Sequence, residues 1–335
     1  MDSTSLVMLH PKFEAKYLGG LPLQVELREK IGSVFFKGRV VPVHTKYEHF
    51  YKDTTDQAVY PSVTTMLSVI NKPHLKQWAV NRGVEYVMDW MKDIPAINKL
   101  DMYEVLERSK TAHKTVLDRA ALWGNGGHNI VDLYVEDWIK LGDRPPYSIL
   151  ELADKDISNE GQCAALGACK FFDEHTLFPI VSEKKILSKK HELGGTLDSL
   201  WLIGDVYKGR EGRKNCNHQW SQKVKGTNVI CNECGREESL ALILIDLKTS
   251  NQITSVEYAY QVAAYSKILT EMCGIKPKLH WILQLNKLKP AFTVGVVDNV
   301  NDYAKAFLHA AALFKHMREN QEPVKMLKTK KVIVL

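Results

Sequence analysis

Residues 242–248 read LILIDLK, an apolar run that ends in an aspartate and a lysine, and this stretch decides the fold that the sequence predicts. A short continuous run of large aliphatic residues, part of it β-branched, is typical of a buried strand. Side chains at positions i and i+2 of a strand share a face, so Asp246 and Lys248 point into the same space while Leu247 points away. The sequence therefore predicts a strand that delivers a carboxylate and an ammonium group to one cavity.

A second strand is predicted upstream, over the aliphatic residues between Leu197 and Ile203, with Asp198 near its start. If the two strands pair in antiparallel orientation, Asp198 comes to lie beside Asp246. Two carboxylates and a lysine in one place are suited to holding a hard divalent cation and to stabilising charge on a phosphate oxygen. For each motif on its own, solvated charges that flank a core strand are the alternative.

Four motifs stand in order along the chain: GNGGH at 124–128, GTLD at 195–198, DLK at 246–248 and QVAAY at 261–265. In this order they resemble the RecB-type branch of the PD-(D/E)xK nuclease superfamily, and the resemblance covers the chain from about Ala112 to Gln284. It implies an α/β fold with a restriction-endonuclease-like core, in which a mixed central sheet is flanked by helices. It also implies the element order helix, three strands, helix, strand.

The resemblance further implies the chemistry of the site. One or two Mg²⁺ or Mn²⁺ ions would be held by His128, Asp198, Asp246 and the backbone carbonyl of Leu247. Imidazole in this set of ligands makes Mn²⁺ especially acceptable. Lys248 would orient or help deprotonate the attacking water, while Gln261 and Tyr265 would orient this lysine or contact a substrate phosphate.

Two further acidic residues are candidates for the site. Asp132 follows His128 by four residues on a predicted helix, so both side chains lie on one face. Family members have a threonine where this chain has Asn125, and a glutamate where it has the shorter Asp132. Glu183 lies on a strand predicted at 179–187, where members of this branch often carry an acid. It would either touch a metal through water or pair with a lysine.

A cysteine-rich insertion, at 208–238, separates the two acid-bearing strands. Four of its residues have the spacing CxH followed by CxxC: Cys216, His218, Cys231 and Cys234. In a reducing compartment this spacing favours structural, tetrahedral zinc over disulfides, with a reactive CxxC redox pair as the alternative. The unit resembles a zinc ribbon. Because it joins the strand of Asp198 to the strand of Asp246, we expect it to fix the ends of this hairpin next to the site.

Other residues around the insertion have simpler interpretations. Cys163, Cys169 and Cys273 lie in apolar helical surroundings and are predicted to be buried thiols. Basic residues from Lys208 to Lys214 are suited to guiding a nucleic-acid strand, although a solvated surface has the same appearance in a sequence.

The composition of the 335-residue chain, 45% hydrophobic and 25% charged, is typical of a globular protein with a full core. There is no run of about 18 apolar residues, and the first residues lack the basic and apolar regions of a signal peptide. We therefore expect no membrane contact and a cytoplasmic location, in a bacterium or a phage-infected host cell. The net charge of +6 permits nucleic-acid binding without requiring it.

Residues 1–110 are predicted to form an N-terminal β-rich and helical region, and residues 111–335 the nuclease core. Apolar alternation predicts strands at 33–37 and 39–43, and Ser62 is a candidate N-cap of the first clear helix. Another helix is predicted to begin near Lys72. Further helices are predicted at 103–141, 157–175, 254–272 and 301–318, and further strands at 279–285 and 291–297.

The predicted function is metal-dependent hydrolysis of DNA phosphodiester bonds. An exonuclease is favoured, because branch members with the motif histidine are frequently DNA exonucleases, acting in phage or bacterial DNA processing, recombination or degradation. The expected partner is DNA, as single strands or duplex ends, and recombination or replication proteins are further candidates. Two alternatives remain open: a structure-specific or defence-related endonuclease of the same fold, and a catalytically silent nucleic-acid-binding module.

Overall fold

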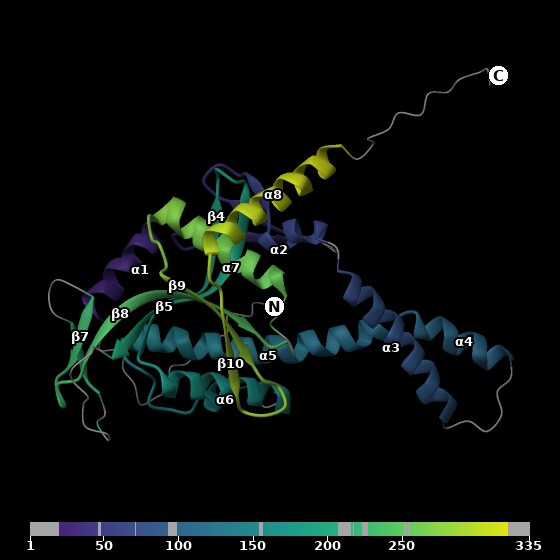
Figure 1. Ribbon diagram of the computed structural model, residues 1–335, viewed down its shortest axis with the longest axis horizontal. Helices are drawn as coiled ribbons and strands as arrows, with labels where there is room; N and C mark the ends of the chain where they lie inside the picture. Colours follow the sequence, from purple (N-terminus) through teal and green to yellow (C-terminus); the bar gives the residue numbers. More distant parts are fainter. Residues whose placement is uncertain are drawn as a thin grey trace, which may run out of the picture.

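A mixed sheet lies at the centre of the protein in a computed structural model, which describes residues 20–320 except for 46–47, 71, 93–98, 154–156, 207–215, 217, 223–226, 251–252 and 254. Its main strands lie in the order β10, β9, β8, β5, β4 (Figure 1). They span Leu177–Ser188 (β4), Leu193–Val206 (β5), Glu237–Lys248 (β8), Leu279–Leu285 (β9) and Phe292–Val296 (β10). β8 and β9 are parallel, whereas the other neighbours on this path are antiparallel.

Helices cover both faces of this sheet. One face packs against α5 (Ala112–Leu141) and α6 (Asn159–Glu174), and the other against α1 (Pro22–Val34), α7 (Val256–Cys273) and α8 (Val300–Glu319). In β8, Ile243 and Ile245 belong to the hydrophobic cluster on the α5–α6 side, while Leu244 belongs to the cluster on the α7 side. The strand is continuously apolar because both of its faces are buried. The predicted α/β class, with a mixed central sheet flanked by helices, is confirmed.

β5 and β8 pair in antiparallel orientation, as the sequence predicts. Ser199 lies opposite Ile245 in this register. One step further along the two strands, the same register puts Asp198 opposite Asp246. The two acidic residues therefore lie at the same end of the β5–β8 hairpin.

The insertion lies at the opposite end of this hairpin, where Val206 pairs with Glu238. At about 3.3 Å per residue, the path along β5 from Asp198 to Val206 is about 26 Å long. The expectation that the insertion fixes the hairpin ends next to the site is therefore wrong. In an antiparallel hairpin, the connection joins the two strands at one end. Asp198 and Asp246 lie at the other end. The basic residues at 208–214 lie outside the described residues.

The insertion itself contributes two short strands, β6 (Trp220–Gln222) and β7 (Asn228–Cys231). They pair with each other, and β7 also pairs with the first residues of β8. A backbone hydrogen bond from Leu23 to the side chain of Gln222, 3.1 Å long, ties the insertion to α1. The described part of the insertion is therefore an extension of the central sheet.

The N-terminal residues form a helix and a separate three-stranded antiparallel sheet. Its strands are β1 (Val40–His44), β2 (His49–Asp53) and β3 (Val59–Pro61). The strand predicted at 39–43 is confirmed as β1. The strand predicted at 33–37 is wrong, because α1 continues to Val34 and is followed by a turn. Ile31 and Phe35, both almost fully buried, anchor this helix against the sheet core.

Most of the other predicted elements are confirmed within a few residues. Ser62 accepts a hydrogen bond from the backbone N–H of Thr65 and caps α2, as predicted. The predicted helix near Lys72 is α3, and the helices predicted at 103–141 are α4 and α5. The remaining bounds are Val63–Met66 (α2), Leu67–Val69 (η1), Pro73–Lys92 (α3), Lys99–Ser109 (α4) and Ile149–Leu152 (η2).

α3 and α4 project away from the sheet beyond one end of α5 (Figure 1). The chain that precedes α3 packs against the sheet instead, because Leu21, Val63 and Met66 belong to the same hydrophobic cluster as residues of the sheet. A division of the chain at residue 110 stays a prediction. Within the described residues, no helix combines the length and the apolar character needed to span a membrane.

Candidate functional site

A cleft of about 700 Å³ opens at the acid-bearing end of the β5–β8 hairpin. Its walls come from elements that are far apart in the sequence. α5 contributes His128 and Asp132, β4 contributes Glu183, β5 contributes Asp198, and the end of β8 contributes Lys248. The cleft therefore collects residues from three of the four sequence motifs.

Asp246 lies beneath this cleft and is fully buried. Its carboxylate Oδ2 lies 2.6 Å from the Nζ atom of Lys248. Its other oxygen, Oδ1, has no hydrogen-bond partner among the described residues. Asp198 Oδ2 accepts a 2.7 Å hydrogen bond from the backbone N–H of Leu247, and its carboxylate is close enough to that of Asp246 for charge repulsion to raise the pKa of Asp246. This inner group of Asp198, Asp246 and Lys248 was predicted from the pairing of the two strands.

An outer group of side chains lies above it. Ligand atoms of His128, Asp132 and Glu183 all lie within 4.8 Å of one another, close enough to hold a metal ion together. The hydroxyl of Ser182 donates a 3.1 Å hydrogen bond to Asp132 Oδ1. The imidazole of His128 also reaches the backbone carbonyl of Leu247. The sequence suggested Asp132 and Glu183 only as additional candidates, and the structure places both beside His128.

The backbone of Glu183 is unusual for a residue in a strand. Its φ angle is +45°, in the left-handed region that residues other than glycine rarely adopt. Such a conformation costs about 1–3 kcal/mol and is concentrated at functional sites. In the β4–β5 register, Glu183 lies opposite Asp198, because the flanking residues Ser182 and Lys184 pair with Ser199 and Leu197. The residue with the strained backbone is therefore also the one whose carboxylate lies near His128 and Asp132.

Burial and charge shift the titration of these groups. Burial raises the pKa of Asp132 and of Glu183, and repulsion between the two carboxylates and Asp198 raises both further. Burial also raises the pKa of Asp246, which its Lys248 neighbour only partly offsets. For His128, burial and the charge of Lys248 lower the pKa to about 4. The site therefore favours protons on its acids and a neutral imidazole, a state that a bound cation would reverse at the carboxyl groups.

Burial alone would lower the pKa of Lys248, but the adjacent carboxyl groups of Asp246 and Asp198 raise it. The ammonium group is therefore kept charged at the edge of the cleft. An aromatic ring packs against this ammonium group. The Nζ atom lies 5.3 Å from the centre of the Tyr258 ring, a cation–π arrangement.

Gly195 connects two of the motifs. A Cβ atom at this position would lie only 2.5 Å from Cε1 of Tyr265 and 3.1 Å from its hydroxyl. The tyrosine ring therefore packs directly on the glycine backbone, next to Asp198. Gln261 Nε2 donates a 3.2 Å hydrogen bond to the hydroxyl of Tyr265, as their i, i+4 spacing on α7 allows. In the structure Gln261 therefore contacts Tyr265, while Tyr258 contacts the lysine.

Tyr258 was not singled out from the sequence. It precedes Gln261 by three residues and Tyr265 by seven, so all three lie on the same side of α7. This spacing is the signal by which it could have been found. Its hydroxyl also donates a 3.3 Å hydrogen bond to Oγ of Ser250, two residues after Lys248.

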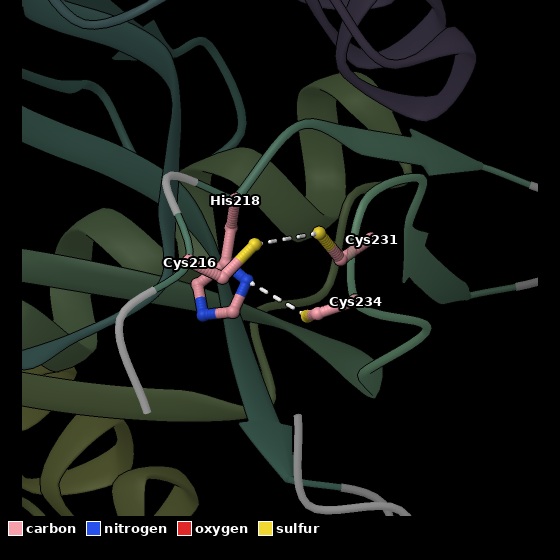
Figure 2. A group of neighbouring side chains, drawn as sticks. All are labelled: Cys216, His218, Cys231 and Cys234. Carbon is pink, nitrogen blue, oxygen red and sulfur yellow. Dashed lines mark hydrogen bonds between the residues drawn. The ribbon is translucent and has the colours of Figure 1, made fainter. Parts of the chain in front are cut away.

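The second cluster of candidate ligands lies in the insertion (Figure 2). Ligand atoms of Cys216, His218, Cys231 and Cys234 all lie within 4.8 Å of one another. The sulfur atoms of Cys216 and Cys231 are 3.7 Å apart, and His218 Nδ1 lies 3.3 Å from the sulfur of Cys234. Two thiolates on one tetrahedral zinc ion are about 3.8 Å apart, whereas a disulfide requires about 2.05 Å. The four residues could therefore hold a metal ion such as zinc.

Local backbone geometry supports this cluster. Gly235 has a φ angle of +73°, and its N–H donates to the carbonyl of Cys231 in a tight turn. Burial alone would raise the pKa of Cys231, but hydrogen bonds from the Cys234 backbone, His218 and the Glu233 backbone lower it to about 6. Thiolate formation at this position favours metal binding. Of the three other cysteines, Cys273 is a buried thiol as predicted, whereas Cys163 and Cys169 are only half-buried.

Each cluster thus has its own chemistry. The cleft offers carboxylates, an imidazole and an ammonium group beside open space, whereas the insertion offers three thiols and an imidazole that could hold a metal ion. The chain matches no protein-family model and no curated protein sequence.

Proposed function

We propose that the protein is a metal-dependent nuclease that hydrolyses phosphodiester bonds in DNA. The observation that carries this proposal is the convergence of His128, Asp198, Asp246 and Lys248 around one cleft. The order of elements α6, β4, β5, β8, α7, β9 supports it, because it is the order that the resemblance to RecB-type nucleases implies. The preference for an exonuclease comes from the same resemblance.

The residues of the cleft fit a hard divalent cation. Asp246 is fully buried, and its Oδ1 atom has no hydrogen-bond partner in the described part of the chain. A buried carboxylate oxygen without a partner is costly unless a proton or a cation satisfies it. Oxygen ligands suit Mg²⁺, and an imidazole makes Mn²⁺ acceptable as well. We propose that His128, Asp198, Asp246 and the Leu247 carbonyl hold one or two such ions, with Asp132 and Glu183 at the outer edge.

A bound cation would supply Lewis-acid activation of the scissile phosphate and of the attacking water. The protein's own groups would do the rest. Lys248, kept charged by Asp246 and Asp198, would orient the water and offset the negative charge that develops on the phosphate oxygens. Glu183 and Asp132, whose pKa values are raised, would exchange a proton with the water or the leaving oxygen.

The four ligands in the insertion support a second, structural proposal. We propose that they bind zinc in a ribbon-like unit. All four positions of the tetrahedron are occupied by protein groups, which leaves no place for substrate or water. The zinc would therefore stabilise the insertion and take no part in the reaction.

The test of the nuclease proposal uses end-labelled linear DNA and closed circular single-stranded DNA, each with Mg²⁺ or Mn²⁺. We expect degradation of linear DNA from its ends and persistence of the circle. Asp246→Asn and Lys248→Ala should remove this activity, while Lys305→Ala, on the exposed surface of α8, should retain it. Cleavage of the circle would favour the endonuclease alternative. Failure of the folded wild-type protein to cut any of these substrates would overturn the proposal and favour a silent binding module.

A further inference from the structure

We propose that Tyr258 is a positioning residue that holds Lys248 toward the cleft when a divalent cation occupies the acidic site. This inference rests on the proposed nuclease function and concerns a residue outside the four motifs. On the side of the cleft, its described contact is with the ammonium group of Lys248, 5.3 Å from the centre of the Tyr258 ring. It acts through the lysine.

Among the described residues, an ion pair and a cation–π contact hold the ammonium group of Lys248. Its Nζ atom lies 2.6 Å from Asp246 Oδ2 and 5.3 Å from the centre of the Tyr258 ring. The ring itself is fixed, because its hydroxyl donates to Ser250 Oγ and its helix packs against the sheet. The backbone carbonyl of Ser250 accepts a 2.6 Å hydrogen bond from Gln284 Nε2. The segment that follows the lysine is therefore held on two sides.

Cation binding changes the balance between these two contacts. A divalent ion at Asp246 shares the carboxylate to which the ammonium group is paired, and its own positive charge repels the lysine. The attraction between the ammonium group and the aromatic face does not depend on this carboxylate. In the cation-loaded state, the ring therefore becomes the main contact that keeps Lys248 in place.

The first experiment measures the position of Lys248 without reference to catalysis. Lysine side chains are acetylated at limiting reagent, with and without Mn²⁺, and the modification of each lysine is followed by mass spectrometry. The exposed Lys305 serves as an internal reference. With Mn²⁺, Tyr258→Leu should raise the acetylation of Lys248 by roughly 2- to 30-fold over wild type, the range expected for loss of one cation–π contact. Without Mn²⁺ the difference should be smaller, because Asp246 still holds the ammonium group.

The second experiment measures DNA cleavage by the same variants. Tyr258→Leu should lower kcat by roughly 2- to 30-fold and leave KM unchanged, because Lys248 acts mainly in the transition state. Tyr258→Phe keeps the ring and should restore kcat to within about twofold of wild type, since only the Ser250 contact is lost. The matched control is Tyr260→Leu, on the same helix. Its ring packs against Tyr303 of α8, with centroids 5.9 Å apart, and none of its described contacts is with Lys248.

The outcomes separate this inference from the proposed function. If wild type cuts no DNA, the nuclease proposal fails, and the acetylation pattern still decides whether Tyr258 holds the lysine. If Tyr258→Leu and Tyr260→Leu behave alike in both experiments, the role of Tyr258 is general packing and the inference is overturned. A Tyr258→Phe variant as defective as Tyr258→Leu would also overturn it, because the aromatic face would then be irrelevant.

Discussion

The two ends of the β5–β8 hairpin each carry a cluster of candidate metal ligands, and the clusters differ in how the chain assembles them. At the insertion end, all four ligands lie between residues 216 and 234, and a turn and a short hairpin bring them together. At the acidic end, His128, Glu183 and Asp246 come from α5, β4 and β8 and meet only once the sheet has formed. The first cluster depends on local folding and the second on the whole core.

The ligands themselves also differ. Thiolates and an imidazole in a closed shell favour a tightly held zinc ion, whereas carboxylates beside a cleft of about 700 Å³ favour a hard cation that exchanges with solvent. The two ends should therefore respond independently to substitution, chelation and pH. The following predictions test this independence.

The largest effect is expected at the inner acidic group. Asp246→Asn or Lys248→Ala should reduce cleavage by about 10² to 10³ or more, because each removes a group central to stabilising charge in the transition state. DNA binding should largely survive, and zinc content should stay at one equivalent per chain. Cleavage assays and elemental analysis of the same folded preparations measure both. Near-wild-type turnover in either variant would exclude this site.

The matching change at the other end is Cys231→Ser combined with Cys234→Ser. It should release one zinc per chain and unfold the insertion, because a unit of this size depends on its metal. Thermal stability or substrate affinity should fall, while Mg²⁺ or Mn²⁺ still binds the acidic cleft at the other end of β5. Less than about half an equivalent of zinc in wild type prepared without chelator would contradict the zinc assignment.

A smaller effect on activity is expected for His128, a member of the outer group. His128→Ala should weaken Mn²⁺ binding and activity by about 10- to 100-fold, with partial rescue at raised Mn²⁺ concentration. Titration calorimetry and activity at several Mn²⁺ concentrations measure this. The contact with the Leu247 carbonyl would be lost as well. If the dependence on metal concentration is unchanged, His128 is a structural histidine.

Part of the dependence of stability on pH should come from the acids of the cleft. Burial raises the pKa values of Asp132, Glu183 and Asp246, so the folded metal-free protein binds more protons than the unfolded chain. Their contribution to stability is present at low pH and is lost as the pH rises above the ordinary carboxyl value of about 4. Mn²⁺ replaces these protons, so a fixed Mn²⁺ concentration of about 100 times its Kd at pH 8 should add about 2.7 kcal/mol at that pH and less near pH 5.5, where protons compete and the Kd is higher. Thermal unfolding at both pH values checks this, and equal Mn²⁺ effects would contradict it.

The smallest effects are expected at two glycines in β5, one toward each end. A Cβ atom at Gly195 would collide with the Tyr265 ring, and one at Gly204 would collide with the carboxylate of the buried Glu238. Each alanine substitution should lower the free energy of unfolding by about 1–3 kcal/mol through overpacking. Only Gly195→Ala should also lower activity, because its ring neighbour lies next to Asp198. Denaturation curves and cleavage rates of the pair give the comparison.

The sequence predicts the inner group of Asp198, Asp246 and Lys248 because the positions of these residues follow from short stretches of sequence and one strand pairing. Buried strands appear as continuous aliphatic runs, and the i, i+2 rule puts Asp246 and Lys248 on one face. Antiparallel pairing with the preceding strand then supplies Asp198. The same reasoning predicts the cysteine cluster, since its ligands are close in the chain.

Other features depend on contacts that spacing does not contain. Asp132 and Glu183 are 51 positions apart, and only the packing of α5 on β4 brings them together. α1 was missed because alternation at 33–37 was given more weight than Leu23, Leu27 and Ile31, which recur every four residues as in a helix. The place of the insertion was misjudged for a different reason. Antiparallel pairing puts the connection at the end of the hairpin opposite to Asp198 and Asp246.

The register of β5 and β8 also makes the connection between Val206 and Glu238 a suitable place to insert or replace a folded unit. The two strands remain paired as far as Val206 and Glu238, so the chain could pass between them through a short turn or a longer folded unit. The entropy cost of closing a loop grows only slowly with its length, by about 0.6 kcal/mol for each doubling. A shortened protein would lose the Gln222 contact to α1 and the buried Val229. The insertion could thus be replaced by another folded unit, while the paired strands keep Asp198 and Asp246 in the same relative positions.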